Sequence, residues 1–408
     1  MIPAAADSSH LSEGPVGPAA PAWLAARLQA AGGRVSFRQY MEWALHDPEH
    51  GSYGSGRLRI GPRGDFATAP SLGPDFAGLV AVQLIDWLEA LAAEQPGPIA
   101  LVETGPGEGD LARELAGLLA EQRPDLAART ELVLVEPNPG MAERQRQCLA
   151  DAPLAGRWVD WPQLAAAPVR GVVLAHEVLD ALAVERIVSD GTLWRRQELA
   201  LRQGTLRLEP GEPLEPEVAA LLVPLDLASP GPQRSAGWCS ELHPGLPPWL
   251  EACGRGLTRG QLLVIDYAHE ARRYYAPQRS AGTLMAYRAQ QASGDPLRDP
   301  GHWDLTAHLC LESLEAAAQA AGWRSLGQRR QGEALLALGL AERLHGLQQL
   351  DPAGLAMALQ RREALLRLAD PHTLGDFRWV AFERGGTPPS SPLPLPRFLR
   401  DPAPLMGP

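Results

Sequence analysis

The stretch Ile99-Ala-Leu-Val-Glu103-Thr-Gly105-Pro-Gly107-Glu-Gly109-Asp110 decides the fold of this 408-residue chain. A short apolar run leads directly into three glycines spaced G-x-G-x-G, and a helical pattern follows from Leu111. Glycine allows the backbone to turn tightly and to bring a ligand against the N-terminus of the next helix. The stretch therefore predicts a strand, a ligand-binding turn and a helix, in that order.

The same alternation of short apolar runs and helices continues after this stretch, whereas the residues before it show mainly helical patterns. Strands that are apolar along their length and alternate with helices are typical of a parallel sheet covered on both faces. We therefore predict a doubly wound α/β fold. Its strands are expected at 99–102, 132–135, 172–175, 262–265, 324–329 and 377–383, and its helices at 23–45, 75–94, 111–121, 141–149, 333–346 and 353–369.

The charges around the glycine turn indicate which cofactor it binds. A dinucleotide fingerprint needs G-x-G-x-x-G, but position 110 is Asp. Glu103, Glu108 and Asp110 would repel a pyrophosphate, whereas the positive sulfonium of S-adenosylmethionine favours carboxylates. The residues thus predict S-adenosylmethionine, bound by Glu103, Gly105, Gly107 and Gly109.

Two carboxylates further along are candidates for the nucleoside. Glu136 ends the next strand, where it could accept hydrogen bonds from both ribose hydroxyls, and the alternative is an ordinary strand-end charge. Asp160 could accept from the adenine amino group, and a purely structural role is equally open. Both residues are retained as cofactor-binding candidates.

A second polar group follows the strand that ends at Ala175. If a helix begins there, Glu177 and Asp180 share a face and could clamp a guanidinium, although they could also be a helix cap and a first-turn acid. His176 could act as a base or be structural. This segment predicts where the methyl acceptor binds.

Composition excludes several other functions. All 37 basic residues are Arg, so lysine-dependent mechanisms are absent, and the net charge of -11 argues against binding nucleic acid through its phosphates. The four cysteines form no metal or disulfide pattern, so we predict no metal site and a cytoplasmic protein. The first residues do not suit a targeting peptide, and we expect no membrane insertion.

Longer phrases resemble the MidA-like family of class I S-adenosylmethionine-dependent methyltransferases, which includes a mitochondrial complex I assembly factor that methylates arginine. The resemblance runs from about Ser36 to Glu383. Its further landmarks are Ser36-Phe-x-x-Tyr-Met, Asp47-Pro-x-His-Gly51-x-Tyr53, Gly61-Pro-Arg-Gly64-Asp65-Phe-x-Thr68-x-Pro70, Glu177-x-Leu-Asp180-Ala-Leu, Ile265-Asp266-Tyr267 and Asp299-Pro-Gly301-x-x-Asp304-Leu-Thr306-Ala-His308.

The resemblance implies roles for further residues. The 47–70 loop would be a lid whose Asp65 and Thr68 face the methionine end of the cofactor; without the family, Asp65 is equally a turn former and Asp304 a helix cap. Glu177, Asp180, Asp266 and His308 would be catalytic, and His176, Tyr267, Asp304 and Thr306 would bind the substrate.

The resemblance also implies a division of the chain and a substrate. We expect a class I (Rossmann-like) methyltransferase sheet in 96–198 and 258–384, N-terminal helices and the lid in 22–95, an insertion or substrate subdomain in 199–257, and disorder in 1–21 and in the proline-rich 385–408. The expected substrate is a protein arginine, in an NADH dehydrogenase-type core subunit. A homodimer is one possible assembly, and another acceptor or a non-catalytic assembly factor are the alternatives.

Three positions depart from the family pattern. His176 replaces an asparagine, Ala183 a proline and Ala268 a glycine. These departures concern the geometry of the acceptor more than the binding of the cofactor.

Overall fold

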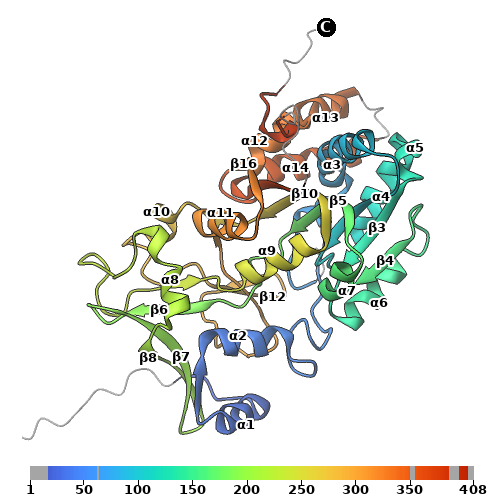
Figure 1. Ribbon diagram of the computed structural model, residues 1–408. Helices are drawn as coiled ribbons and strands as arrows, with labels where there is room; N and C mark the ends of the chain where they lie inside the picture. Colours follow the sequence, from blue (N-terminus) through green and yellow to red (C-terminus); the bar gives the residue numbers. More distant parts are fainter. Residues whose placement is uncertain (1–16, 62–63, 350–353, 386–394, 403–408) are drawn as a thin grey trace, which may run out of the picture.

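The computed structural model describes residues 17–61, 64–349, 354–385 and 395–402 (Figure 1). Its central sheet has the order β16-β17-β10-β5-β2-β3-β4. If the seven strands are numbered in chain order and read from the β4 edge, the strand order is 3-2-1-4-5-7-6. The strands are β2 (Ile99–Thr104), β3 (Thr130–Val135), β4 (Gly156–Val159), β5 (Val169–His176), β10 (Leu257–Asp266), β16 (Arg324–Arg330) and β17 (Arg378–Arg384).

Strand direction confirms the predicted α/β class. The five strands from β4 to β10 are parallel, whereas β17 is antiparallel to β10 and β16 is antiparallel to β17. Because successive side chains of a strand point to opposite faces, Leu101 and Val102 of β2 enter two different cores. The sheet is therefore buried on both faces, which explains why its strands lack polar alternation.

Helices supply the two covering layers. One face is covered by α3 (Pro74–Glu94), α4 (Asp110–Gln122), α5 (Pro124–Ala127), α12 (Gln331–Ala337), α13 (Leu340–Gly346) and α14 (Leu355–Ala369). The other is covered by α7 (Trp161–Ala166), α9 (Leu246–Arg255) and α11 (Leu311–Ala320). Among the described residues, α3 alone is long and apolar enough to cross a membrane, but 61% of its apolar window is buried, as in a core helix.

A second sheet lies at the other end of the molecule (Figure 1). It joins the N-terminal extension to the insertion, because β1 pairs with β7 through Val35 and Leu199. The predicted boundary at 199 therefore falls inside β7. Its elements are α1 (Ala22–Ala30), β1 (Arg34–Ser36), α2 (Phe37–His46), β6 (Glu185–Ser189), β7 (Trp194–Arg202), β8 (Thr205–Pro213), α8 (Pro216–Ala220), η2 (Val223–Leu225) and β9 (Cys239–Leu242).

A further excursion, which the sequence did not predict, separates β10 from β16. Asp304 lies in strand β14, and the N-cap position of the helix that follows is Cys310, so the alternative that Asp304 caps that helix is wrong. The excursion contains β11 (Ala268–His269), α10 (Ala271–Tyr274), β12 (Met285–Arg288), β13 (Gln291–Ser293), β14 (Asp304–Thr306) and β15 (Leu309–Cys310).

Parts of the two predicted disordered ends are ordered. The segments 1–16, 386–394 and 403–408 lie outside the described residues. However, Ala20 donates a hydrogen bond to the carbonyl of Gly204, and the buried Phe398 ring packs 5.6 Å from that of Trp379. The C-terminal stretch is ordered because the buried Phe398 anchors it to the core, whereas a backbone hydrogen bond fixes the N-terminal one. The short helices η1 (Ala69–Leu72), α6 (Pro139–Cys148), η3 (Leu347–Gln349), η5 (Leu374–Asp376) and η6 (Arg397–Leu399) complete the fold.

Candidate active site

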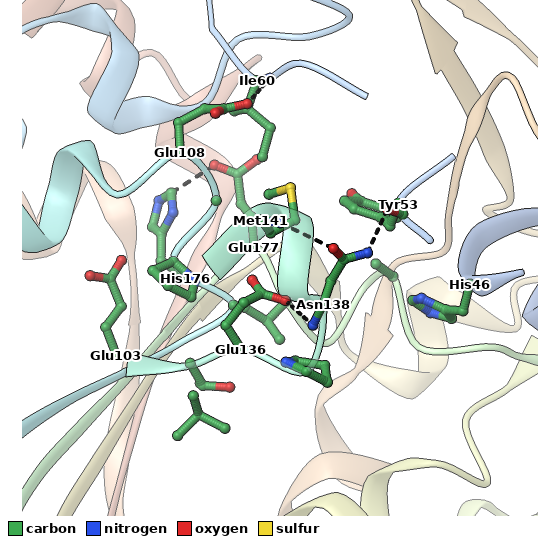
Figure 2. A pocket seen from close by; sticks show the side chains of 18 of the residues that line it. His46, Tyr53, Ile60, Glu103, Glu108, Glu136, Asn138, Met141, His176 and Glu177 are labelled. Atoms are coloured by element: carbon green, nitrogen blue, oxygen red, sulfur yellow. Dashed lines mark hydrogen bonds and ion pairs between the residues drawn. The ribbon is translucent and has the colours of Figure 1, made fainter. Parts of the chain in front are cut away.

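A cavity of about 750 Å³ opens at the carboxyl ends of β2, β3 and β5. This is the edge at which parallel α/β sheets bind ligands. The glycine turn, the lid loop, the start of α6 and the end of α2 enclose it (Figure 2). Eight of the sixteen predicted residues line it: Thr68, Glu103, Gly105, Gly107, Glu136, Asp160, His176 and Glu177.

The glycine turn has the backbone geometry that its spacing predicts. Gly105, Gly107 and Gly109 have φ angles of 57°, 57° and 93°, in the left-handed region that favours glycine. A Cβ on Gly109 would lie 2.9 Å from the Leu149 side chain, and one on Gly107 would lie 3.1 Å from Ile60 of the lid. The turn therefore needs glycine both for its conformation and for close packing.

Glu136 is held firmly beside this turn. One of its carboxylate oxygens accepts from the Asn138 backbone N–H at 2.8 Å, and the other accepts from the Gln145 amide at 3.0 Å. The Gln145 amide also donates to the Gly107 carbonyl at 2.9 Å, and its oxygen accepts from Trp158 at 3.0 Å. Each Glu136 oxygen keeps a second lone pair, which fits the predicted hydrogen bonds from two ribose hydroxyls, and that role stays a prediction.

The first turns of α6 also fasten the lid. The Asn138 amide donates to the carbonyls of Tyr53 and Gly54, at 2.8 and 3.1 Å. Arg144 donates to Glu108 at 2.9 Å and to the Gly56 carbonyl at 2.9 Å. Neither residue was predicted, because nothing in the local sequence connects α6 to a loop some 85 residues earlier.

Asp65 is placed differently from its predicted position. It does not line the cavity; its carboxylate accepts from the backbone N–H groups of Arg59 and Ala289, at 3.0 and 3.2 Å. Asp65 therefore shapes the lid loop and ties it to the β12–β13 turn. Thr68, in contrast, lines the cavity.

Asp160 has a structural role that the sequence left open. It caps α7 in a reciprocal capping box, in which its carboxylate accepts from the Gln163 N–H at 2.8 Å. It also borders the cavity, so its hydrogen bond to adenine remains a prediction. Next to it, Trp161 and Trp249 form an edge-to-face pair with ring centroids 5.6 Å apart. This apolar wall is not predictable from the sequence, because the two tryptophans lie far apart in the chain.

The charge of the cavity fits a cationic cofactor. Seven lining residues are acidic, and none of the lining residues that the structure describes is an arginine. Glu103 is 4% exposed, its Oε2 has no hydrogen-bond partner, and burial raises its pKa to about 8. A buried carboxyl of this kind needs a cationic partner, which the ammonium and sulfonium groups of S-adenosylmethionine would supply.

The segment after β5 forms a turn rather than the helix considered from the sequence. Glu177 has φ 51°, and Asp266 holds the turn by accepting from the backbone N–H groups of Leu179 and Asp180, at 3.0 and 3.2 Å. The proposed shared helical face of Glu177 and Asp180 is therefore wrong. Asp266 acts as a positioning residue beneath them, and it does not line the cavity.

Four carboxyl groups nevertheless gather around this turn. Burial is the main cause that raises the pKa of Glu177, Asp180, Asp266 and Asp304, to about 7 for Asp180 and about 8 for Asp304. Repulsion from Asp180 raises the other three further, whereas a hydrogen bond with Tyr53 lowers the pKa of Asp304. Across the described ranges, none of the four carboxyls pairs with an arginine.

The histidines near this cluster are neutral. Burial lowers the pKa of His176 to about 3, so its Nε2, which lies 3.4 Å from Glu177 Oε1, forms no ion pair at physiological pH. His308, predicted to be catalytic, lies outside the cavity lining and packs against Tyr267 and His269, with ring centroids 5.4 and 4.7 Å away. Tyr267 and Thr306 also lie behind the lining.

The 3-2-1-4-5-7-6 sheet, the glycine turn and the carboxylate-lined cavity together define a methyltransferase of the class I fold that uses S-adenosylmethionine. The family described as "Putative S-adenosyl-L-methionine-dependent methyltransferase" matches residues 79–329. The chain belongs to this family. It is an S-adenosylmethionine-dependent methyltransferase, and S-adenosylmethionine is its cofactor.

Individual relatives agree with this assignment. The chain is 28% identical, over 89% of its length and 85% of the relative, to the protein arginine methyltransferase NDUFAF7 homolog of Drosophila melanogaster. It is 26% identical to the mitochondrial NDUFAF7 of Danio rerio, over 72% of this chain and 71% of the relative. A methyltransferase-related protein of Burkholderia thailandensis, solved with bound S-adenosyl-homocysteine, superposes with a TM-score of 0.79 at 29% identity and covers 93% and 94% of the two chains.

Proposed function

We propose that this methyltransferase methylates the guanidinium of an arginine side chain in a protein. The observation that carries the proposal is a cluster of four carboxyls: Asp180, Asp266 and Asp304 are buried, and Glu177 lines the cofactor cavity. None of the four pairs with an arginine among the described residues. Buried carboxyls that repel one another are unfavourable unless a cation joins them. A cationic acceptor would relieve this repulsion.

Guanidinium suits the cluster better than ammonium does. Its planar fork presents five N–H donors and can pair with two carboxylates at once, and it is more weakly hydrated than a lysine ammonium. Glu177 lines the cavity itself, while Asp180 and Asp304 lie behind it. Glu177 would hold the guanidinium at the cofactor, and the deeper carboxyls would hold its charge away from the attacking nitrogen.

The cofactor supplies the methyl group as part of a sulfonium. As a guanidinium nitrogen forms the new N–C bond, the S–C bond breaks and its electron pair remains on sulfur. The methylated nitrogen then loses an N–H proton, and the proposed acceptor of this proton is the Glu177 carboxylate. A distance near 3 to 3.5 Å between nitrogen and methyl carbon is what such a transfer requires, so the chain acts mainly by positioning.

The relatives support the acceptor class, because they are named protein arginine methyltransferases. The family resemblance extends the proposal to a core subunit of an NADH dehydrogenase-type complex, methylated during assembly. The described cysteines are all free thiols, which agrees with the proposed cytoplasmic location, although the relatives are named mitochondrial. A methyl acceptor other than arginine is the competing function.

The test is transfer of radiolabelled methyl groups into a cell extract and into the purified subunit, followed by mass spectrometry. We expect label on arginine, and none after the target arginine is replaced by lysine. Label on another residue or on a small molecule would establish a different acceptor. Binding of S-adenosylmethionine without label on any arginine would contradict the proposal.

A further inference from the structure

The outer face of α14 exposes an unusual row of leucines. Leu355, Leu359 and Leu366 are 57%, 56% and 45% exposed. At 100° per residue they fall within a stripe about 40° wide along the helix. Single exposed apolar residues are ordinary, but an aligned row on one helix marks a contact surface.

The helix that carries this row is firmly fixed. On its inner side Arg361 makes two hydrogen bonds to the buried Asp75 of α3, at 2.8 and 2.6 Å, and Leu365 and Leu368 enter the core. In Figure 1, α14 lies at the end of the molecule away from α1 and α2. A partner on this face would therefore leave the active-site cavity, which is bordered by α2, accessible.

The residues that flank the leucines are balanced in charge. Leu359, Leu366 and four charged residues line a shallow groove on α14, namely Arg362, Glu363, Arg367 and Asp370. Two positive and two negative side chains give this face no net charge, in a chain whose overall charge is -11. A strongly basic or acidic partner would match a face of one sign, whereas a second acidic copy needs a neutral one.

We propose that this α14 face, defined by Leu359, Arg362, Glu363 and Leu366, is the contact of a two-fold symmetric dimer of this chain. The order of residues is self-complementary when two copies of α14 run antiparallel. A two-fold axis between positions 362 and 363 places Leu359 opposite the second copy's Leu366, and Arg362 opposite its Glu363. Symmetry repeats both pairs, as an isologous interface requires.

The first test is sedimentation velocity of the full chain between about 1 and 100 µM, a range in which one helix pair can associate measurably. We expect a concentration-dependent dimer, and Leu359→Glu should weaken it more than about tenfold. The matched control is Met357→Glu, because Met357 is 54% exposed on the opposite side of the same helix. A wild-type chain that stays monomeric throughout, or a dimer indifferent to Leu359→Glu, overturns the proposal.

A charge exchange tests the register itself. Arg362→Glu and Glu363→Arg should each weaken the dimer about tenfold, because each places like charges opposite one another twice. The double variant restores both opposite-charge pairs, and its dissociation constant should return to within about threefold of wild type. If the double variant is as weak as the sum of the singles, α14 does not pair in this register.

Discussion

The two halves of the active site differ in how well their polar groups are satisfied. Around the cofactor, both Glu136 oxygens, the Gln145 amide and the Asn138 side chain all have hydrogen-bond partners. Around the acceptor, Glu177 Oε1 and Asp304 Oδ1 are buried with no hydrogen-bond partner in the described structure. The cofactor half is thus already organised except at Glu103, whose Oε2 has no hydrogen-bond partner, whereas both unpartnered oxygens of the acceptor half lie where the acceptor is held.

The two halves also differ in the parts of the sequence from which they are built. The carboxylate and amide groups of the cofactor half come from one segment, 103–145, with the lid closed onto it. The acceptor half brings together the β5 turn, the end of β10 and strand β14. The insertion separates the first two, and β14 belongs to the later excursion. The groups that bind the cofactor are therefore close together in the sequence, whereas the groups that select the acceptor come from distant segments.

The largest expected effect comes from neutralising the acceptor half. Glu177→Gln should lower kcat/KM for the arginine acceptor about 1000-fold, because a desolvated charged hydrogen bond is lost where the guanidinium is held. The dissociation constant for S-adenosylmethionine should stay within about threefold of wild type. Peptide kinetics and calorimetry measure the two quantities, with the exposed Glu143→Gln as control. An equal loss of kcat/KM and of affinity for S-adenosylmethionine would show that the cofactor and acceptor halves are not independent.

The next effect concerns the cofactor half alone. Gly107→Val should weaken S-adenosylmethionine about 100-fold in calorimetry, because a β-branched residue at φ 57° is strained and its side chain would press on Ile60. Gly117→Ala in α4 is the control, since a Cβ there meets no atom within 4 Å. Wild-type affinity in Gly107→Val would contradict the assignment of the turn to the cofactor.

The sequence predicts the cofactor half more completely than the acceptor half. The strands β2, β3, β5 and β10 are predictable because both faces are buried and the runs are apolar throughout. In contrast, β4 has only two apolar residues among its four and lies at a sheet edge, so no periodicity marked it.

Only some of the residues of the acceptor half, and few of their roles, are predictable from the sequence. The resemblance pointed to Asp304, but its place in a strand depends on pairing with Met285–Tyr287. That Asp266 holds the β5 turn follows from hydrogen bonds between residues 86 and 87 positions apart. Such contacts are set by the tertiary fold and leave no local signal.

A smaller effect tests whether the lid belongs to the cofactor half. Arg144→Met should weaken S-adenosylmethionine about tenfold, since it removes charge-assisted hydrogen bonds to Glu108 and the lid carbonyls. Hydrogen exchange of 54–60 should also become faster. Arg144→Lys should recover the affinity only partly, because lysine lacks the planar fork. An unchanged exchange rate, compared with the exposed control Arg113→Met, would separate the lid from cofactor binding.

The smallest expected effect is on stability. It tests directly whether the acceptor half holds an unsatisfied carboxyl. The pKa of Asp304 is raised from 3.8 to about 8, so the folded protein holds a proton that the unfolded chain releases. This group therefore favours folding at low pH and loses that contribution as pH rises from about 4 to about 8. Asp304→Asn removes the titrating group, so the variant should become increasingly more stable than wild type as the pH rises from about 4 to about 8.

We expect Asp304→Asn to melt about 3 °C above wild type near pH 9 and to differ little near pH 5, while transferring methyl groups more slowly. The exposed Asp151→Asn should leave the melting temperature unchanged at both values. A melting temperature below wild type at alkaline pH would mean that Asp304 is a satisfied structural carboxyl, and the two halves would then not differ in kind. Stabilisation together with slower transfer would mean that the chain retains an unfavourable carboxyl because the acceptor needs it.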